Sequence, residues 1–107
     1  MLNIFYTELA DADLIGIYIY TYETWGESQA VRYSDALKAA IYRLAEEPRL
    51  PGTLDRSGLY PGCRSYLVKR HLILYRVVED SLEVVRILHG RMDIPSRIAE
   101  FYDQEEW

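Results

Sequence analysis

The chain has 107 residues, of which 50% are hydrophobic and 27% charged. This length allows about one domain with one modest core, and this composition is typical of a folded globular protein and excludes a disordered chain. Apolar runs such as residues 14–22 are too short to span a bilayer, and no basic region precedes an apolar run at the N-terminus. We therefore expect a cytoplasmic protein without membrane contact.

Few residues are available for metal or disulfide chemistry. Cys63 is the single cysteine, so it has no partner for an internal disulfide, and His71 and His89 lie too far from it in sequence for a zinc spacing. The sequence therefore predicts no cofactor and no metal. We expect Cys63 to be a semi-buried, inert thiol.

The formal charge of −5 is unevenly divided along the chain. Residues 1–47 carry 3 basic and 8 acidic side chains, residues 48–97 carry 9 and 5, and residues 98–107 carry 0 and 4. The middle segment alone is basic. Its charges either face an acidic partner or phosphates, or are simply solvated at a sheet edge.

The first elements follow local signals. Residues Asn3–Tyr6 are rich in β-formers and predict an opening strand. Thr7 is suited to cap a helix from Glu8 to Trp25, because its hydroxyl can accept from backbone N–H groups of the first turn. The apolar positions of this helix recur at three- and four-residue steps. They are Leu14, Ile17, Tyr18 and Thr21.

A second helix is predicted from Gln29 to about Glu47. Gly26 is suited to end the first helix, Ser28 to cap the second, and Pro48 to stop it. The short link implies an antiparallel helix hairpin. Residues 49–62, rich in proline, glycine and polar side chains, predict a long loop.

Three strands then follow in close succession, at Arg64–Lys69, Leu72–Val78 and Leu82–His89. Because tight turns separate them, we expect a largely antiparallel meander. A short helix is predicted at Ile94–Tyr102. The whole chain, residues 1–107, is thus expected to be one α+β domain: strand, helix hairpin, three-stranded meander and C-terminal helix.

The last two strands predict a hairpin that is apolar on both faces. With a two-residue turn at Asp80–Ser81, Tyr75 lies opposite Arg86 and Arg76 opposite Val85. One face then carries Ile73, Tyr75, Val77, Val84, Arg86 and Leu88, and the other carries Leu72, Leu74, Arg76, Val85, Ile87 and His89. The helices can cover one face, and either residues 94–107 or a partner protein must cover the other.

Three stretches, in this order, resemble the ParE family of the RelE/ParE toxin superfamily: EEPRLPG, PGCRSYLVKRHLILYRV and VRILHGRMD. The resemblance covers roughly residues 3–98. It implies a small bacterial toxin that inhibits DNA gyrase and is neutralised by a ParD-like antitoxin lying over the sheet and the helix hairpin. On this reading the second apolar face and the hairpin arginines serve a partner.

The RelE-like branch of the superfamily, which cleaves mRNA on the ribosome, is an alternative. Matching its motif places Leu72 and Met92 where that branch has arginines, and neither side chain can stabilise a phosphate or transfer a proton. A shift of one residue in this alignment would bring in His71 or Arg91. A non-toxic antitoxin-binding module is a third possibility.

We predict no catalytic residue and no sequence-specific nucleic-acid binding. The residues expected to contact the target or the antitoxin come from the basic segment and its strands. They are Arg64, Lys69, Arg70, Tyr75, Arg76, Arg86, His89, Arg91 and Asp93.

Overall fold

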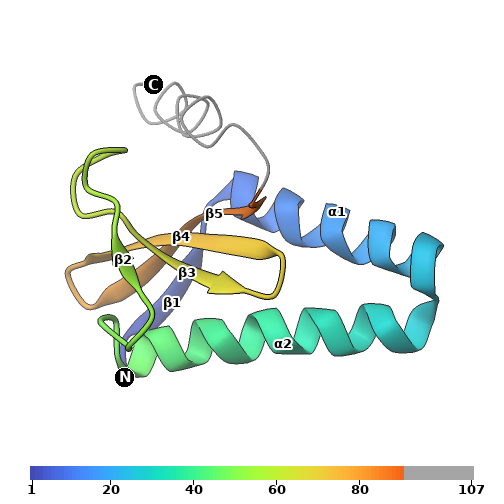
Figure 1. Cartoon of the computed structure of the whole chain (residues 1–107). Coiled ribbons are helices and arrows are strands. Elements are labelled where there is room, and N and C mark those ends of the chain that lie inside the picture. The colour runs from blue at the N-terminus through green and yellow to red at the C-terminus, as the bar shows by residue number, and fades with distance from the viewer. Residues whose placement is uncertain (91–107) are drawn as a thin grey trace.

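A computed structural model describes residues 1–90 of the chain. The elements in chain order are β1 (Asn3–Tyr6), α1 (Glu8–Trp25), α2 (Glu27–Glu46), β2 (Leu54–Asp55), β3 (Arg64–Val68), β4 (His71–Val78) and β5 (Ser81–His89) (Figure 1). This α+β order confirms the predicted fold class. The predicted helix at Ile94–Tyr102 lies outside the described residues.

Local capping explains where α1 begins and ends. The Thr7 hydroxyl accepts from the backbone N–H of Ala10 at 3.0 Å, and also donates to the carbonyl of Val85 at 2.7 Å. Gly26, with a φ of 92°, ends the helix, because only glycine adopts this region without strain. The predicted bounds of β1 and α1 are therefore confirmed.

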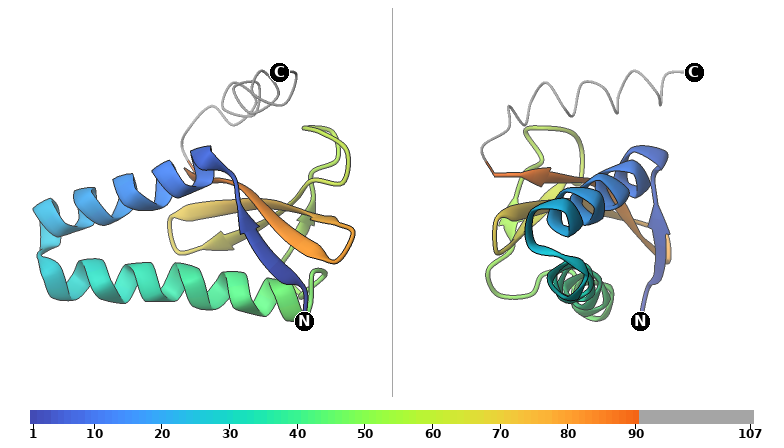
Figure 2. Two further views of the ribbon diagram at one scale, coloured as in Figure 1. Left: turned by 180° about the vertical axis from the view of Figure 1, so that it is seen from behind. Right: turned by 90° about the vertical axis from the view of Figure 1, so that its right-hand side faces the viewer.

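The start of α2 differs from the prediction. The helix begins at Glu27, directly after Gly26, and not at Gln29. Ser28 lies inside the first turn, where its hydroxyl accepts from the guanidinium of Arg32 at 3.0 Å instead of capping the helix. A single glycine therefore joins the two helices. The ends that it joins, the C-terminal end of α1 and the N-terminal end of α2, extend beyond the β3–β4 turn (Figures 1 and 2).

The strands form one sheet in the order β1-β5-β4-β3-β2. The β1 strand pairs in parallel with β5, to which the helices and the other strands connect it, and the other pairs are antiparallel. This confirms a largely antiparallel sheet. The loop predicted at residues 49–62 contains the short strand β2, whose Leu54 pairs with Ser65 of β3.

The main core lies between the helices and one face of the sheet. Its fully buried side chains include Leu37, Ile41 and Leu44 of α2 and Ile73 and Tyr75 of β4. Leu14 and Ile17 of α1 pack against this cluster, as their spacing predicts. No helix within residues 1–90 is long and apolar enough to cross a membrane.

A second cluster covers part of the opposite face. It joins Leu74, Val85 and Leu88 of the sheet to Tyr60 and Cys63 of the preceding loop. The loop therefore supplies part of a cover that we expected from residues 94–107 or from a partner. The expected contribution of residues 94–107 lies outside the described part of the chain.

The predicted register of the β4–β5 hairpin is wrong. Val78 pairs with Ser81, so the two-residue turn is Glu79–Asp80, one position earlier than predicted. A β-bulge then follows: Tyr75 pairs with Val84, but Leu74 pairs with Arg86, which leaves Val85 as the extra residue on β5.

The bulge exchanges the faces of the residues that follow it. Ile87 packs in the main core and Leu88 in the second cluster, the reverse of the prediction. A slip of one residue moves every later side chain to the other face, which is why the bulge has this effect. The pairs between the turn and the bulge differ from the prediction because the turn comes earlier: Tyr75 lies opposite Val84 rather than Arg86, and Arg76 opposite Glu83 rather than Val85.

Candidate interaction site

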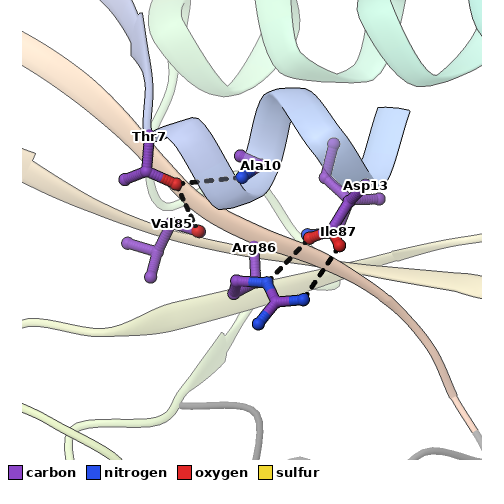
Figure 3. Close-up of polar contacts among 6 residues, drawn as sticks. All are labelled: Thr7, Ala10, Asp13, Val85, Arg86 and Ile87. Carbon is purple, nitrogen blue, oxygen red and sulfur yellow. Dashed lines mark hydrogen bonds and ion pairs between the residues drawn. The ribbon is translucent and has the colours of Figure 1, made fainter. Parts of the chain in front are cut away.

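Arg86 is held by a carboxylate from α1. Its Nε and Nη2 atoms donate to the two carboxylate oxygens of Asp13 at 2.8 and 2.9 Å, and the backbone N–H of Ile87 donates to the same side chain at 3.0 Å (Figure 3). The bidentate geometry suits the planar guanidinium of arginine. Thr7, the N-cap of α1, donates to the carbonyl of Val85, so the start of α1 is fastened to β5 at a second point (Figure 3).

Arg76 is also paired within the chain. Its Nε atom lies 2.6 Å from a carboxylate oxygen of Glu83, directly across the hairpin, and its guanidinium lies 5.0 Å from the ring centre of Tyr60. Both hairpin arginines thus have internal carboxylate partners. A role for either as an anchor for a partner's acidic groups stays a prediction, and would require these pairs to be shared or exchanged.

Tyr75 lies in the core rather than on a surface. Its side chain is fully buried, and its hydroxyl donates to the carbonyl of Pro48 at 2.6 Å. Arg64, its register partner on β3, donates to the Thr53 hydroxyl at 2.8 Å. Tyr75 therefore ties the loop after α2 to the sheet from a packing position, and its role in contacting a partner stays a prediction.

A groove of about 670 Å³ opens between the helix hairpin and the β3–β4 turn, and we call it the hairpin groove. Its walls are mainly apolar. They are formed by Ala12, Asp13, Gly16, Ile17, Tyr20, Thr21 and Trp25 of α1, Gln29 and Tyr33 of α2, Lys69, Arg70 and His71 at the turn, and Ile87 and His89 of β5. Tyr20 and Trp25 are largely exposed there, with relative exposures of 69% and 71%.

The two histidines meet at one side of this groove. The hydroxyl of Tyr33 lies 2.6 Å from Nδ1 of His71, and the rings of His71 and His89 meet edge to face with their centres 5.5 Å apart. Burial, and next the neighbouring His89, lower the pKa of His71, while Asp13 acts in the opposite direction. His71 is therefore neutral near pH 7.

Two cations lie at the rim of the groove. Lys69, in the left-handed region with a φ of 54°, places its Nζ atom 5.6 Å from the ring centre of Tyr33. The backbone N–H of Arg70 donates to the Tyr33 hydroxyl at 3.4 Å, and both Lys69 and Arg70 are exposed. The groove thus combines an apolar wall with a positively charged rim, which suits an amphipathic, acidic segment.

The structure gathers three of the nine predicted contact residues at this groove, namely Lys69, Arg70 and His89. Arg64, Arg76 and Arg86 lie on the sheet away from the turn, and Tyr75 is buried. Arg91 and Asp93 lie outside the described residues.

The sequence did not indicate Tyr33, Trp25 or Asp13 as members of this region. They lie on the two helices, outside the basic segment from which the contact residues were predicted. The available signal was that an all-round apolar helix such as α1 cannot bury every apolar side chain in so small a protein.

The described residues offer little for nucleophilic or metal chemistry of the usual kinds. Cys63 is fully buried, and burial raises the pKa of its thiol to about 11, which agrees with the inert thiol that we predicted. Within residues 1–90 no three histidine, cysteine or acidic side chains come together as a metal-binding group. Leu72 packs against the second cluster.

The sequence is similar to those of known toxins. The family model described as "ParE toxin of type II toxin-antitoxin system, parDE" matches residues 4–94. The chain is 42% identical over 98 residues to toxin ParE of Escherichia coli, covering 88% of this chain and 90% of the relative. It is 41% identical over 86 residues to toxin ParE1 of Mycobacterium tuberculosis, covering 79% and 86%.

Solved structures share the fold. A chain of the chromosomal ParDE system from P. aeruginosa superposes with a TM-score of 0.70 at 21% identity, covering 83% of this chain and 96% of that one. A chain of the YoeB-YefM complex from Staphylococcus aureus superposes with a TM-score of 0.57 at 17% identity, covering 84% and 98%. At these sequence identities the superpositions show only that the fold is shared.

Proposed function

The chain belongs to the ParE toxin family of type II toxin-antitoxin systems, and on that premise we propose that it acts in the cytoplasm as an inhibitor of bacterial DNA gyrase. We further propose that a ParD-like antitoxin binds it and keeps it silent. The relationship to toxins named ParE carries this proposal. The fold alone does not, because the YoeB-YefM complex shares it.

The hairpin groove supports the antitoxin part of the proposal. It exposes Tyr20 and Trp25 beside the cations Lys69 and Arg70. Large exposed aromatic side chains next to positive charge are typical of protein-binding surfaces. A partner segment with apolar side chains and carboxylates would fill the groove and neutralise its rim.

A ribosome-dependent mRNA nuclease of the RelE type is the second candidate. One observation favours it, since a neutral His71 hydrogen-bonded to Tyr33 is a plausible group for moving a proton. One observation opposes it, since Leu72, at the position matched to a key arginine of that branch, is an apolar residue packed against the second cluster. An antitoxin-binding module without toxicity is the third candidate.

A supercoiling and cleavage assay with purified gyrase tests the proposal. The full-length protein should inhibit supercoiling and trap cleaved DNA, and the cognate antitoxin should abolish both effects. Growth arrest with mRNA cleaved at ribosomes and gyrase unaffected would overturn the gyrase target in favour of the nuclease. Antitoxin binding without growth arrest would identify the non-toxic module.

Paired charge variants ask where the antitoxin binds. The double variant Lys69→Ala with Arg70→Ala removes two cations at the groove rim, and Lys38→Ala with Arg43→Ala removes two exposed cations of α2 that do not line the groove. The first variant should bind antitoxin more weakly and become more sensitive to salt than the second. Equal effects would place the antitoxin contact elsewhere.

A further inference from the structure

His71 and His89 are direct partners across the β4–β5 pair. The neighbouring pair, Arg70 and Gly90, carries a backbone hydrogen bond of 3.0 Å from the Gly90 N–H to the Arg70 carbonyl. Because hydrogen-bonded and non-hydrogen-bonded pairs alternate along an antiparallel ladder, the histidines form a non-hydrogen-bonded pair. In such pairs the side chains are closest, so the backbone itself holds the two imidazoles together.

The spacing of the rings is the spacing that a shared metal ion needs. Their centres are 5.5 Å apart, with the ring planes at 85°. Two imidazoles bound to one tetrahedral ion through bonds of about 2 Å would have their centres about 5 Å apart. The distance between the two ring centres therefore matches the distance expected for two imidazoles bound to one ion.

Tyr33 provides the support that a metal-binding histidine usually has. Its hydroxyl contacts Nδ1 of His71 at 2.6 Å, which leaves Nε2 on the other side of the ring. Histidine ligands commonly have the second ring nitrogen hydrogen-bonded to a protein oxygen, which fixes the tautomer and the direction of the ring. A phenol hydroxyl can accept as well as donate, so it can serve His71 with or without a bound ion.

We propose that His71 and His89 bind one divalent transition-metal ion, such as Zn²⁺ or Ni²⁺, at the side of the hairpin groove, with Tyr33 as the residue that positions His71. Imidazole ligands favour these ions over Mg²⁺ or Ca²⁺. Asp13 also lines the groove but is engaged by Arg86 and Ile87, and within the described residues no third ligand completes the set. The remaining coordination positions are open to water or to a carboxylate of a bound partner.

This site goes beyond the proposed function and does not depend on it. The sequence makes it easy to test, because these are the only two histidines of the 107 residues. The single thiol, Cys63, is fully buried and does not compete. Imidazole-dependent metal binding by the chain must therefore come from this pair.

Calorimetric titration of the full-length protein without an affinity tag, with ZnCl₂ and separately with NiCl₂, measures the binding. We expect one ion per chain, no comparable binding of MgCl₂, and loss of binding in both His71→Gln and His89→Gln. Tyr33→Phe should weaken binding by about tenfold. Tyr42→Phe, at an exposed tyrosine of the same helix outside the groove, is the matched control and should bind as the native chain does.

A second measurement on the native chain removes any dependence on the folding of the variants. In ¹⁵N spectra of the two imidazoles, Zn²⁺ should move one ring nitrogen of each histidine toward the range of a metal-bound atom. Ring signals that stay in place, or binding that persists in the double variant His71→Gln with His89→Gln, would overturn the proposal. In the latter case carboxylates elsewhere in the chain would be the ligands.

Discussion

Each of the two arginines on the β4–β5 hairpin is paired with a carboxylate, and the two pairs differ in how far apart their members lie in sequence. Arg76 meets Glu83 within the hairpin, whereas Arg86 meets Asp13, which lies 73 positions earlier. Asp13 therefore joins α1 to β5 across a long stretch of sequence. The Asp13 carboxylate also accepts a hydrogen bond from the backbone N–H of Ile87. Ile87 lies in β5 beyond the residues of that strand that pair with β1.

The Asp13–Arg86 pair should contribute strongly to stability, because the Arg86 side chain is only 7% exposed and Asp13 only 15%. Replacing Asp13 with Ala should lower the free energy of unfolding by about 3 kcal/mol, since a buried guanidinium then loses its bidentate partner. Asp11→Ala, which removes an exposed acidic residue from the same helix, is the control and should cost well under about 1 kcal/mol. Chemical denaturation measures both, and equal losses would show that only the helix charge matters.

Cys63 should make the fold sensitive to alkaline pH. Burial raises the pKa of its thiol from 9.0 to about 11, so the folded state holds this proton over a range in which the unfolded state has released it. The resulting stability is fully present below pH 9 and is lost as the pH rises toward 11. Between pH 8 and pH 10 the native chain should lose about 1 kcal/mol more than Cys63→Ala does.

Denaturation curves of the two proteins at both pH values check this difference, and the tyrosines that titrate in the same range are common to both proteins. A parallel loss in native chain and variant would mean that the thiol ionises without a folding penalty. Labelling with a thiol reagent at pH 8 should also be slow until denaturant is added, because the thiolate is the reactive form.

At the scale of elements, predictions succeeded where the signals were local. The bounds of β1 and α1 agree with the structure because Thr7 and Gly26 act within a few residues of themselves. The β4–β5 register failed for the opposite reason. A two-residue turn is usually marked by Asn-Gly or Asp-Gly, but here Glu79 adopts a φ of 56°. The extra residue of the bulge, Val85, packs in the second cluster, against residues distant in sequence that no local pattern indicates.

Two glycines of the helix hairpin should respond oppositely to alanine. Gly26 has a φ of 92°, so Gly26→Ala should destabilise the fold by about 1–3 kcal/mol through backbone strain. No other group lies within 4 Å of either added Cβ atom, so steric crowding plays no part. Gly16 is an exposed residue within α1, and Gly16→Ala should stabilise the fold by about 0.5–1 kcal/mol. Thermal unfolding measures both, and effects of the same sign would contradict this account.

At the scale of the whole molecule, the arrangement of α1 leaves apolar surface without a cover among the described residues. Ala10 and Thr21 are its buried residues, while Ile15, Ile19, Tyr20, Tyr22 and Trp25 are at least half exposed. The sequence identified the cations of the groove, because Lys69 and Arg70 belong to its one basic segment. It did not identify the apolar wall, because periodicity in an all-round apolar helix does not show which side faces the core.

The exposed end of α1 should matter for binding and not for folding. If the proposed antitoxin fills the hairpin groove, Trp25 is the largest side chain that it can cover, and a buried tryptophan at the centre of an interface typically contributes about 2 kcal/mol or more. Trp25→Ala should therefore weaken antitoxin binding by roughly 30-fold while leaving thermal stability nearly unchanged, since the side chain is 71% exposed in the free protein.

Tyr42→Ala is the matched control for this prediction, because Tyr42 is 56% exposed on α2 and does not line the groove. Titration calorimetry with the purified antitoxin should show the native affinity for this control. Equal affinities for both variants would place the antitoxin away from the groove, for example on the sheet face where Arg76 lies. A loss with Trp25→Ala alone would instead mean that the apolar surface left open along α1 is the surface that the toxin presents to its partner.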